Sequence, residues 1–226
     1  MSIDYRYEIK FVLDNSGLSS VMNWIYSYTF ARKKYEKRKV NNLYVDDVYF
    51  SSAKDNLAGV SDRRKMRLRW YGKNSNISQF FFEIKKRNDR IGYKKTYSLD
   101  SLQNNSIKLD INNLLFECRK ELEKQQVFFD DPLVPTLNTS YDREYYSDMN
   151  GVRITIDQNI HFYRSLPNQK LNISFPLSYP YKVMEIKFEP NLKNRVAELI
   201  KPLHITPRRH SKYLVGLAML GDVVYI

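Results

Sequence analysis

Hydrophobic and polar residues alternate with a period of two in several stretches of the chain. The clearest region, residues 65–97, holds three such stretches separated by short polar breaks: 65–71, 80–87 and 92–97. Alternation of this kind is typical of β-strands whose two faces meet different surroundings. In the first stretch Met66 and Leu68 share one face, whereas Arg67 and Arg69 lie on the other. The pattern predicts successive antiparallel strands that place rows of cations side by side.

The same alternation returns on both sides of this region. It predicts further strands at Asp4–Leu13, Asn42–Phe50, Val134–Tyr146, Gly151–Ile160 and Val183–Glu189. Arg, Lys and Glu dominate the polar faces of most of these strands. Since like charges on neighbouring strands repel each other, the arrangement favours a shared polar interior with an anionic guest over independent solvated surfaces.

Steps of three and four residues between apolar positions identify the helices. The clearest predicted helix is Leu109–Gln126, and others are predicted at Leu18–Tyr28, Leu192–Ile200 and Ser211–Leu220, with a short helix or turn at Ser51–Val60. We interpret the basic run 32–39 as a solvated loop or helix end, and the proline-containing segment 164–181 as a long loop. The expected fold class is α+β and mainly β.

Composition limits the class of protein. The 226 residues suit one domain, 1–226, and the 18 tyrosines and 12 phenylalanines favour strands. A net charge of +12 indicates an anionic partner. The single Cys118 excludes a disulfide framework and a cysteine-based zinc site, and we expect a core-facing thiol. With no apolar run of transmembrane length, we expect a cytoplasmic protein.

Alternating arginines suggest phosphate recognition. The guanidinium groups of Arg67 and Arg69 bind phosphate bidentately, and several such cations on one face would hold a chain of phosphates without reading any base. Glu8 and Glu185 stand among these cations on the first and last strands. On the residues alone, salt bridges to neighbouring cations explain the two glutamates best, and ligation of Mg²⁺ or Mn²⁺ is the alternative.

Several short motifs follow one another along the chain: Arg6-x-Glu8-x-Lys10, Lys65-x-Arg67-x-Arg69, Glu83-x-Lys85, Lys94-Lys95, Tyr141-x-Arg143, the segment 152–157, Glu185-x-Lys187 and Ser211-Lys212-Tyr213. Taken together and in this order, they resemble the VTC domain, the polyphosphate polymerase branch of the triphosphate tunnel metalloenzymes, which also include CYTH-type triphosphatases. The resemblance covers about residues 5–216.

The resemblance implies a closed antiparallel barrel of eight strands with a basic tunnel and a few packing helices. It implies an enzyme that transfers the terminal phosphoryl group of ATP to a growing polyphosphate chain with Mn²⁺ or Mg²⁺, without specific nucleic acid, and with membrane-associated partner proteins. The implied catalytic cations are Lys10, Arg67, Arg69, Lys85, Arg143, Arg153 and Lys212. Lys94 or Lys95, Tyr141 and Ser211 would bind substrate, and Glu185, with Glu8, would hold the metal.

One departure bears on the reaction. Tunnel triphosphatases carry Glu-x-Glu pairs on the first and last strands, whereas this chain has one carboxylate at each place, Glu8 and Glu185. Fewer metal ligands favour polymerase over hydrolysis by water. The alternatives are a triphosphatase in the same tunnel, a non-catalytic polyphosphate-binding module and an RNA-binding sheet. The last would use exposed aromatic residues such as Tyr71, Phe81 and Tyr97 as stacking platforms.

Overall fold

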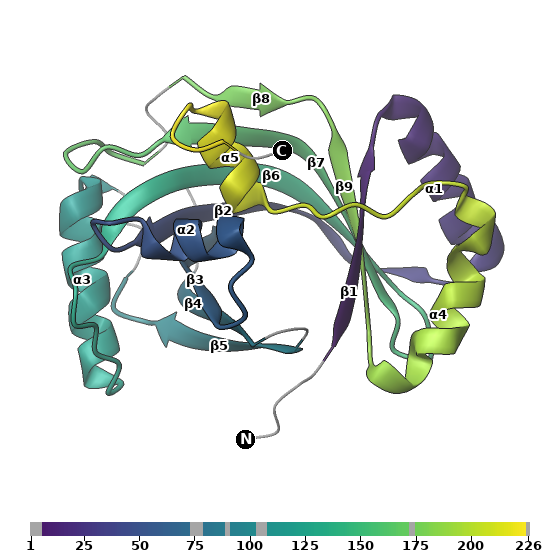
Figure 1. The fold of residues 1–226 in the computed structure, drawn as a ribbon, viewed down its shortest axis with the longest axis horizontal. Coiled ribbons are helices and arrows are strands. Elements are labelled where there is room, and N and C mark those ends of the chain that lie inside the picture. Colours follow the sequence, from purple (N-terminus) through teal and green to yellow (C-terminus); the bar gives the residue numbers. More distant parts are fainter. Residues whose placement is uncertain (1–5, 73–78, 89–90, 103–107, 172–174, 225–226) are drawn as a thin grey trace. The chain divides into compact units, whose positions relative to one another are not determined.

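The computed structural model describes residues 6–72, 79–88, 91–102, 108–171 and 175–224 (Figure 1). The strands are β1 (Tyr7–Leu13), β2 (Arg32–Asp46), β3 (Arg63–Tyr71), β4 (Phe80–Asn88), β5 (Ile91–Leu99), β6 (Val134–Ser147), β7 (Arg153–Arg164), β8 (Leu177–Tyr179) and β9 (Lys182–Phe188). The helices are α1 (Asn15–Tyr28), α2 (Ser51–Ala58), α3 (Ile111–Lys124), α4 (Lys193–Ile200) and α5 (Lys212–Met219), with 3₁₀ turns at Pro190–Leu192 and Lys201–Leu203. The fold is therefore mainly β, as predicted.

The strands form one sheet in the order β1-β9-β7-β6-β2-β3-β4-β5, with β8 paired to β7. The ladders β1–β9, β9–β7, β2–β3, β3–β4 and β4–β5 are antiparallel. This order begins at β1 and ends at β5, and no ladder among the described residues joins these two strands. The expectation of a closed barrel is therefore wrong, because the sheet is open.

Most predicted elements lie within a few residues of the observed ones. The first residues of the strand predicted at Asp4–Leu13 lie outside the described residues. The interpretation of the basic run 32–39 is wrong, because this run forms the first half of β2. The segment 164–181 is not entirely a loop either, since it contains the end of β7 and the short β8.

The chain divides into two compact units, and β2, β6, β7 and β8 contribute residues to both. Unit 1 comprises residues 1–38, 141–160 and 178–210, and unit 2 comprises 39–140, 161–177 and 211–226. The single-domain expectation stays a prediction.

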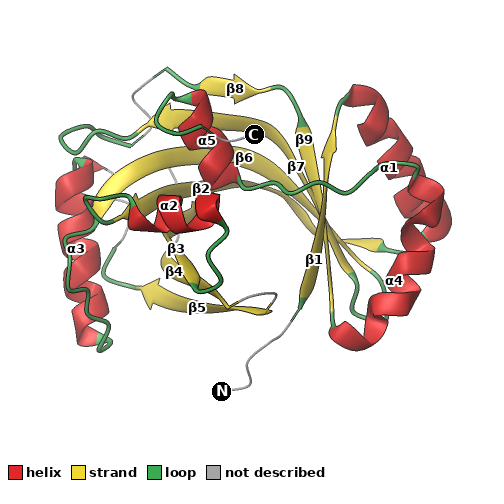
Figure 2. Cartoon of the chain, viewed as in Figure 1, coloured by secondary structure: helices red, strands yellow, loops and turns green. Residues whose placement is uncertain are grey.

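The core of unit 1 lies between its strands and the helices α1 and α4, which are close together in Figure 2. Phe11, Ile154 and Ile186 supply the apolar strand face, and Val21 of α1 and Val196 of α4 pack against this cluster. The Nε1 group of Trp24 donates to the Leu199 carbonyl at 2.8 Å and ties the two helices together. The opposite strand face is left for polar residues.

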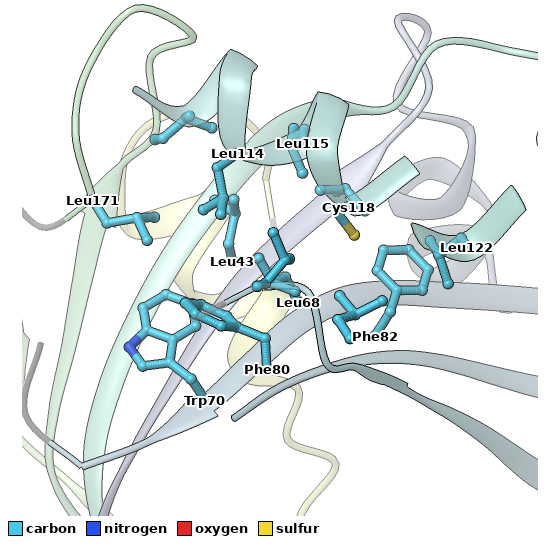
Figure 3. Close-up of a cluster of buried hydrophobic side chains, with 14 of the residues drawn as sticks. Leu43, Leu68, Trp70, Phe80, Phe82, Leu114, Leu115, Cys118, Leu122 and Leu171 are labelled. Carbon is cyan, nitrogen blue, oxygen red and sulfur yellow. The ribbon is translucent and has the colours of Figure 1, made fainter. Parts of the chain in front are cut away.

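The core of unit 2 lies between α3 and the apolar face of β2 to β5 (Figure 3). Leu68, Trp70 and Phe82 point from the strands toward Leu114 and Cys118 of the helix. Cys118 is fully buried, which confirms the expected core-facing thiol. The cations of the same strands consequently share the other face of the sheet.

Among the helices in the described part of the chain, none is both long and apolar enough to cross a bilayer.

Candidate functional site

In unit 2 the strand register gathers three cations around one buried carboxylate. Arg67 lies opposite Glu83 in the β3–β4 ladder, and Glu83 lies opposite Thr96 in the β4–β5 ladder. The Nε and Nη2 atoms of Arg67 lie 2.7 and 2.6 Å from Glu83 Oε2, and Arg69 Nη1 lies 3.4 Å from the same oxygen. Lys94 Nζ donates to the other oxygen, Oε1, at 2.5 Å. We call these four residues the Glu83 cluster.

The electrostatics of this cluster favour an ionised carboxylate. The side chain of Glu83 is only 4% exposed. Burial by itself would raise the pKa of this carboxyl group, but Arg67, Arg69 and Lys94 outweigh it and hold the pKa far below its ordinary value. One negative charge therefore orients three positive ones, and the cluster keeps a net positive charge for an anionic ligand.

β2 lies on the opposite side of β3 from β4, and its polar side chains also hold the two arginines. Arg69 Nε donates to Asn42 Oδ1 at 2.8 Å, and Arg67 Nη1 donates to the Tyr44 hydroxyl at 3.3 Å. The Arg67 guanidinium also lies 5.9 Å from the centre of the Tyr44 ring. With two or more partners each, both arginines are held in place before any ligand binds.

A second buried carboxylate positions α5, which carries Ser211 and Lys212 at its start. The hydroxyl of Tyr213 donates to Asp46 Oδ2 at 3.0 Å, and Asp46 also accepts the backbone N–H groups of Ser52 and Ala53 at the start of α2. The helices α2 and α5 consequently lie side by side (Figure 1). The Tyr213 ring stacks on Tyr44 at 4.9 Å between centroids, which links α5 to the Glu83 cluster.

The start of α5 also meets the cationic strand face directly. Lys65 Nζ donates to Ser211 Oγ at 3.0 Å, and the same oxygen accepts the Leu214 N–H as the helix N-cap. Lys212 is the first residue of the helix and is half-buried. A helix N-terminus flanked by lysines favours an anion.

The strand register separates the two lysines that the sequence left as alternatives. Lys94 lies opposite Lys85, on the polar face that also carries Glu83. Lys95 lies opposite Ile84, whose side chain packs against the core of unit 2. Only Lys94 thus shares a face with the phosphate ligands predicted on β3 and β4.

Unit 1 has its own polar strand face. Arg143 Nε and Nη2 donate to the two oxygens of Asp157 at 2.5 and 2.7 Å, a bidentate pair. The Arg143 guanidinium lies 5.2 Å from the centre of the buried Tyr141 ring. Lys10 of β1 donates to the His210 carbonyl at 3.1 Å. The three residues predicted as ligands on these strands are therefore ordered by protein partners.

Both predicted metal ligands, Glu185 and Glu8, lie close to the same lysine, Lys187. Lys187 Nζ lies 3.3 Å from Glu185 Oε1 and 3.6 Å from Glu8 Oε1. Arg153 lies opposite Lys187 in the β7–β9 ladder and is exposed. This ion pairing is the arrangement that the residues alone favoured for both glutamates.

Glu8 and Glu185 provide two carboxylates for a divalent metal ion. Among the described residues no group of three or more His, Cys, Asp or Glu side chains is arranged to hold one. Mg²⁺ commonly takes one or two carboxylates and completes its shell with water and substrate phosphates. Glu185, buried to 10% exposure, and Glu8 fit that limited role and no larger one.

Residues that hold the predicted ligands in place were not predicted from the sequence. Asn42, Tyr44 and Asp46 alternate along β2 and face the same side of the sheet, and this period-two pattern of polar residues could have identified them. Glu83 and Asp157 stood in motifs, but their partners depend on the register of two strands.

The chain matches the sequence profile of the VTC domain over residues 5–221. It is 24% identical over 235 residues to vacuolar transporter chaperone complex subunit 2 of Saccharomyces cerevisiae, covering 79% of this chain and 28% of the yeast protein. The chain thus spans little more than a quarter of that relative.

Solved structures share the fold at low sequence identity. A protein of Pyrococcus horikoshii OT3 has a TM-score of 0.55 at 15% identity, with 95% of this chain and 99% of the other covered. A putative adenylyl cyclase from Hippeastrum, described as having a dominant triphosphatase activity, has a TM-score of 0.52 at 13% identity, with 98% of each chain covered. A putative adenylate cyclase from Vibrio parahaemolyticus has 0.54 at 12%, with 96% and 99% covered.

Proposed function

Because the chain belongs to the VTC domain family, we propose that it is a polyphosphate polymerase-like transferase that uses ATP as phosphoryl donor. The observation that carries the proposal is the Glu83 cluster, in which cations ordered by a buried carboxylate share a strand face with further lysines. Such a face suits a ligand with several phosphates. The yeast relative's membership of a vacuolar transporter chaperone complex supports partner proteins, and we place the reaction in the cytoplasm, where ATP is available.

In the proposed reaction the terminal phosphate oxygen of polyphosphate attacks the γ-phosphorus of ATP. The bond from this phosphorus to the bridging oxygen breaks, ADP leaves, and the polymer is one unit longer. Because phosphoryl transfer passes through a loose transition state, positioning and charge stabilisation account for most of the catalysis. No side-chain nucleophile is needed when the acceptor is itself a phosphate.

The cations have distinct parts in this scheme. Arg67 and Arg69 hold phosphate oxygens in fixed directions, because Glu83, Tyr44 and Asn42 already orient their guanidinium groups. Lys85, Lys94 and Lys212 add point charges that follow the phosphates as the chain advances. In unit 1, Lys10 would add a further point charge, and Arg143 and Arg153 would bind phosphate oxygens through their guanidinium groups. Tyr141 and Ser211 would be supporting contacts in their respective units.

Glu185 would hold a divalent ion, Mn²⁺ or Mg²⁺, which when bound would supply neutralisation of phosphate charge. Glu8 would support it from β1. The scarcity of carboxylates is our reason for preferring transfer to phosphate over transfer to water.

The test is product analysis of the purified protein with ATP and Mn²⁺. We expect a ladder of polymer on a phosphate-stained gel with a matching amount of ADP. Orthophosphate without a ladder would instead establish a triphosphatase, and bound ATP without turnover would leave a binding module. Either result would overturn the proposed function.

Single substitutions test which residues the proposed activity depends on. Arg67→Ala and Glu185→Ala are each expected to lose most polymer formation, about 100-fold or more, because the first removes a cation that would contact transition-state charge and the second removes the carboxylate that would hold the metal ion. Arg119→Ala is the matched control, since Arg119 forms a surface pair with Glu123 on α3. Wild-type rates in Arg67→Ala and Glu185→Ala would refute the assignment of these residues.

A further inference from the structure

Lys187 links the two carboxylates that would hold a metal ion. Its ammonium nitrogen is 3.3 Å from Glu185 and 3.6 Å from Glu8. The register explains this contact, because Glu8 lies opposite Lys187 and Lys10 lies opposite Glu185 in the β1–β9 ladder. The lysine therefore satisfies the same oxygen atoms that a divalent ion requires.

The surrounding charges also disfavour a bare cation. The same strand face of unit 1 carries the cations Lys10, Arg143, Arg153 and Lys187 against the carboxylates Glu8, Asp157 and Glu185. Asp157 is already committed to Arg143 by two hydrogen bonds. A divalent ion that arrived alone would enter a face with an excess of positive charge.

A phosphate ligand reverses this balance. A triphosphate brings several negative charges, offers its own oxygens to the metal and gives the flexible ammonium group of Lys187 a new partner. Glu185 would then be able to hold the ion. Lys187 and the metal ion compete for the same carboxylate, Glu185, so the phosphate ligand has to arrive before the ion or together with it.

We propose that Lys187 controls metal entry: it keeps Glu185 and Glu8 from binding a divalent ion alone, so that the ion enters as its complex with a triphosphate. The identity of this ligand rests on the proposed function. The competition between the lysine and the metal rests only on the contacts within unit 1.

The test measures Mn²⁺ binding without nucleotide, by the loss of the electron paramagnetic resonance signal of free Mn²⁺. Wild-type protein is expected to bind weakly, and Lys187→Met at least about tenfold more tightly, because a competing charge within 4 Å has been removed. Lys187→Arg keeps the charge and is expected to stay near wild type. Lys201→Met is the matched control, as it removes a lysine from an exposed pair with Glu198.

A double variant tests whether the tighter Mn²⁺ binding depends on Glu185. Lys187→Met with Glu185→Gln is expected to return to weak binding. The proposal is overturned if Lys187→Met binds no more tightly than Lys201→Met, if the gain survives Glu185→Gln, or if wild-type protein already binds Mn²⁺ tightly. Because no nucleotide is present, a failure here is distinguishable from a failure of the polymerase assay.

Discussion

Replacing Glu83 by Gln tests whether one carboxylate holds the cations of unit 2 together. The substitution keeps the side-chain shape but removes the charge that Arg67, Arg69 and Lys94 share. Removing one partner of a buried ion pair costs about 3–5 kcal/mol. Of the three cations only Arg69 is nearly buried, with 7% exposure, while Lys94 is 46% exposed. We therefore expect the lower end, about 3 kcal/mol.

Thermal unfolding provides the assay. For a chain of this length, that loss corresponds to a fall in Tm of about 6–12 °C. Glu117→Gln is the matched control, because Glu117 pairs with Lys120 on the exposed face of α3 and should cost less than about 1 kcal/mol. A Tm of Glu83→Gln equal to that of the control would refute the reasoning.

Ligand binding gives an independent check of the same prediction. In Glu83→Gln the three cations no longer share their charge with a carboxylate. Tripolyphosphate should therefore raise the Tm of this variant by more than it raises that of the wild type. An equal or smaller rise would mean that these cations do not contact the anion, or that the orientation given by Glu83 outweighs the charge that it neutralises.

Three further predictions concern stability and reactivity. Gly216→Ala should cost about 1–3 kcal/mol in urea unfolding, because an added Cβ would lie 2.5 Å from Leu137 Cδ2 and 2.7 Å from Phe162 Cδ1; unchanged stability would contradict this close packing of α5. Because the pKa of Glu83 is lowered on folding, ionised Glu83 stabilises the folded state above pH 4.5, the ordinary carboxyl value, and this stabilisation is lost progressively as the pH falls below 4.5. The Tm difference between wild type and Glu83→Gln should therefore shrink in acid. A constant difference would argue against an ionised Glu83. Burial raises the pKa of the Cys118 thiol, so it should resist alkylation until the protein is denatured, and rapid labelling of native protein would place it outside the core.

The sequence was most informative where the two faces of a strand differ chemically. In β3, apolar Met66 and Leu68 alternate with Arg67 and Arg69, and both the strand and the cationic face were predicted. In the first half of β2, both faces are polar and largely exposed. Without a hydrophobic period, the run 32–39 had no strand signal, and pairing with neighbouring strands decides its structure instead.

Contacts that depend on strand register could not be predicted from the sequence. Whether Glu83 meets Arg67 or a different cation depends on how β3 is aligned with β4, and a shift of one residue would move it to the other face. The choice between Lys94 and Lys95 depended on register for the same reason. The open sheet was missed because the resemblance supplied a closed barrel and no local pattern reports on the pairing of the terminal strands.

The contact between Tyr213 and Asp46 joins residues that are 167 positions apart. During synthesis on the ribosome, β2 and α2 emerge long before α5 is made. Asp46 can therefore accept the N–H groups of Ser52 and Ala53 early, but its bond from Tyr213 cannot form until nearly all the described chain has been made. Contacts of such long sequence separation form slowly. Docking of α5, and with it the placement of Ser211 and Lys212, is thus expected among the last steps of maturation, and a chain arrested before this point would lack the ordered helix start that carries these two residues.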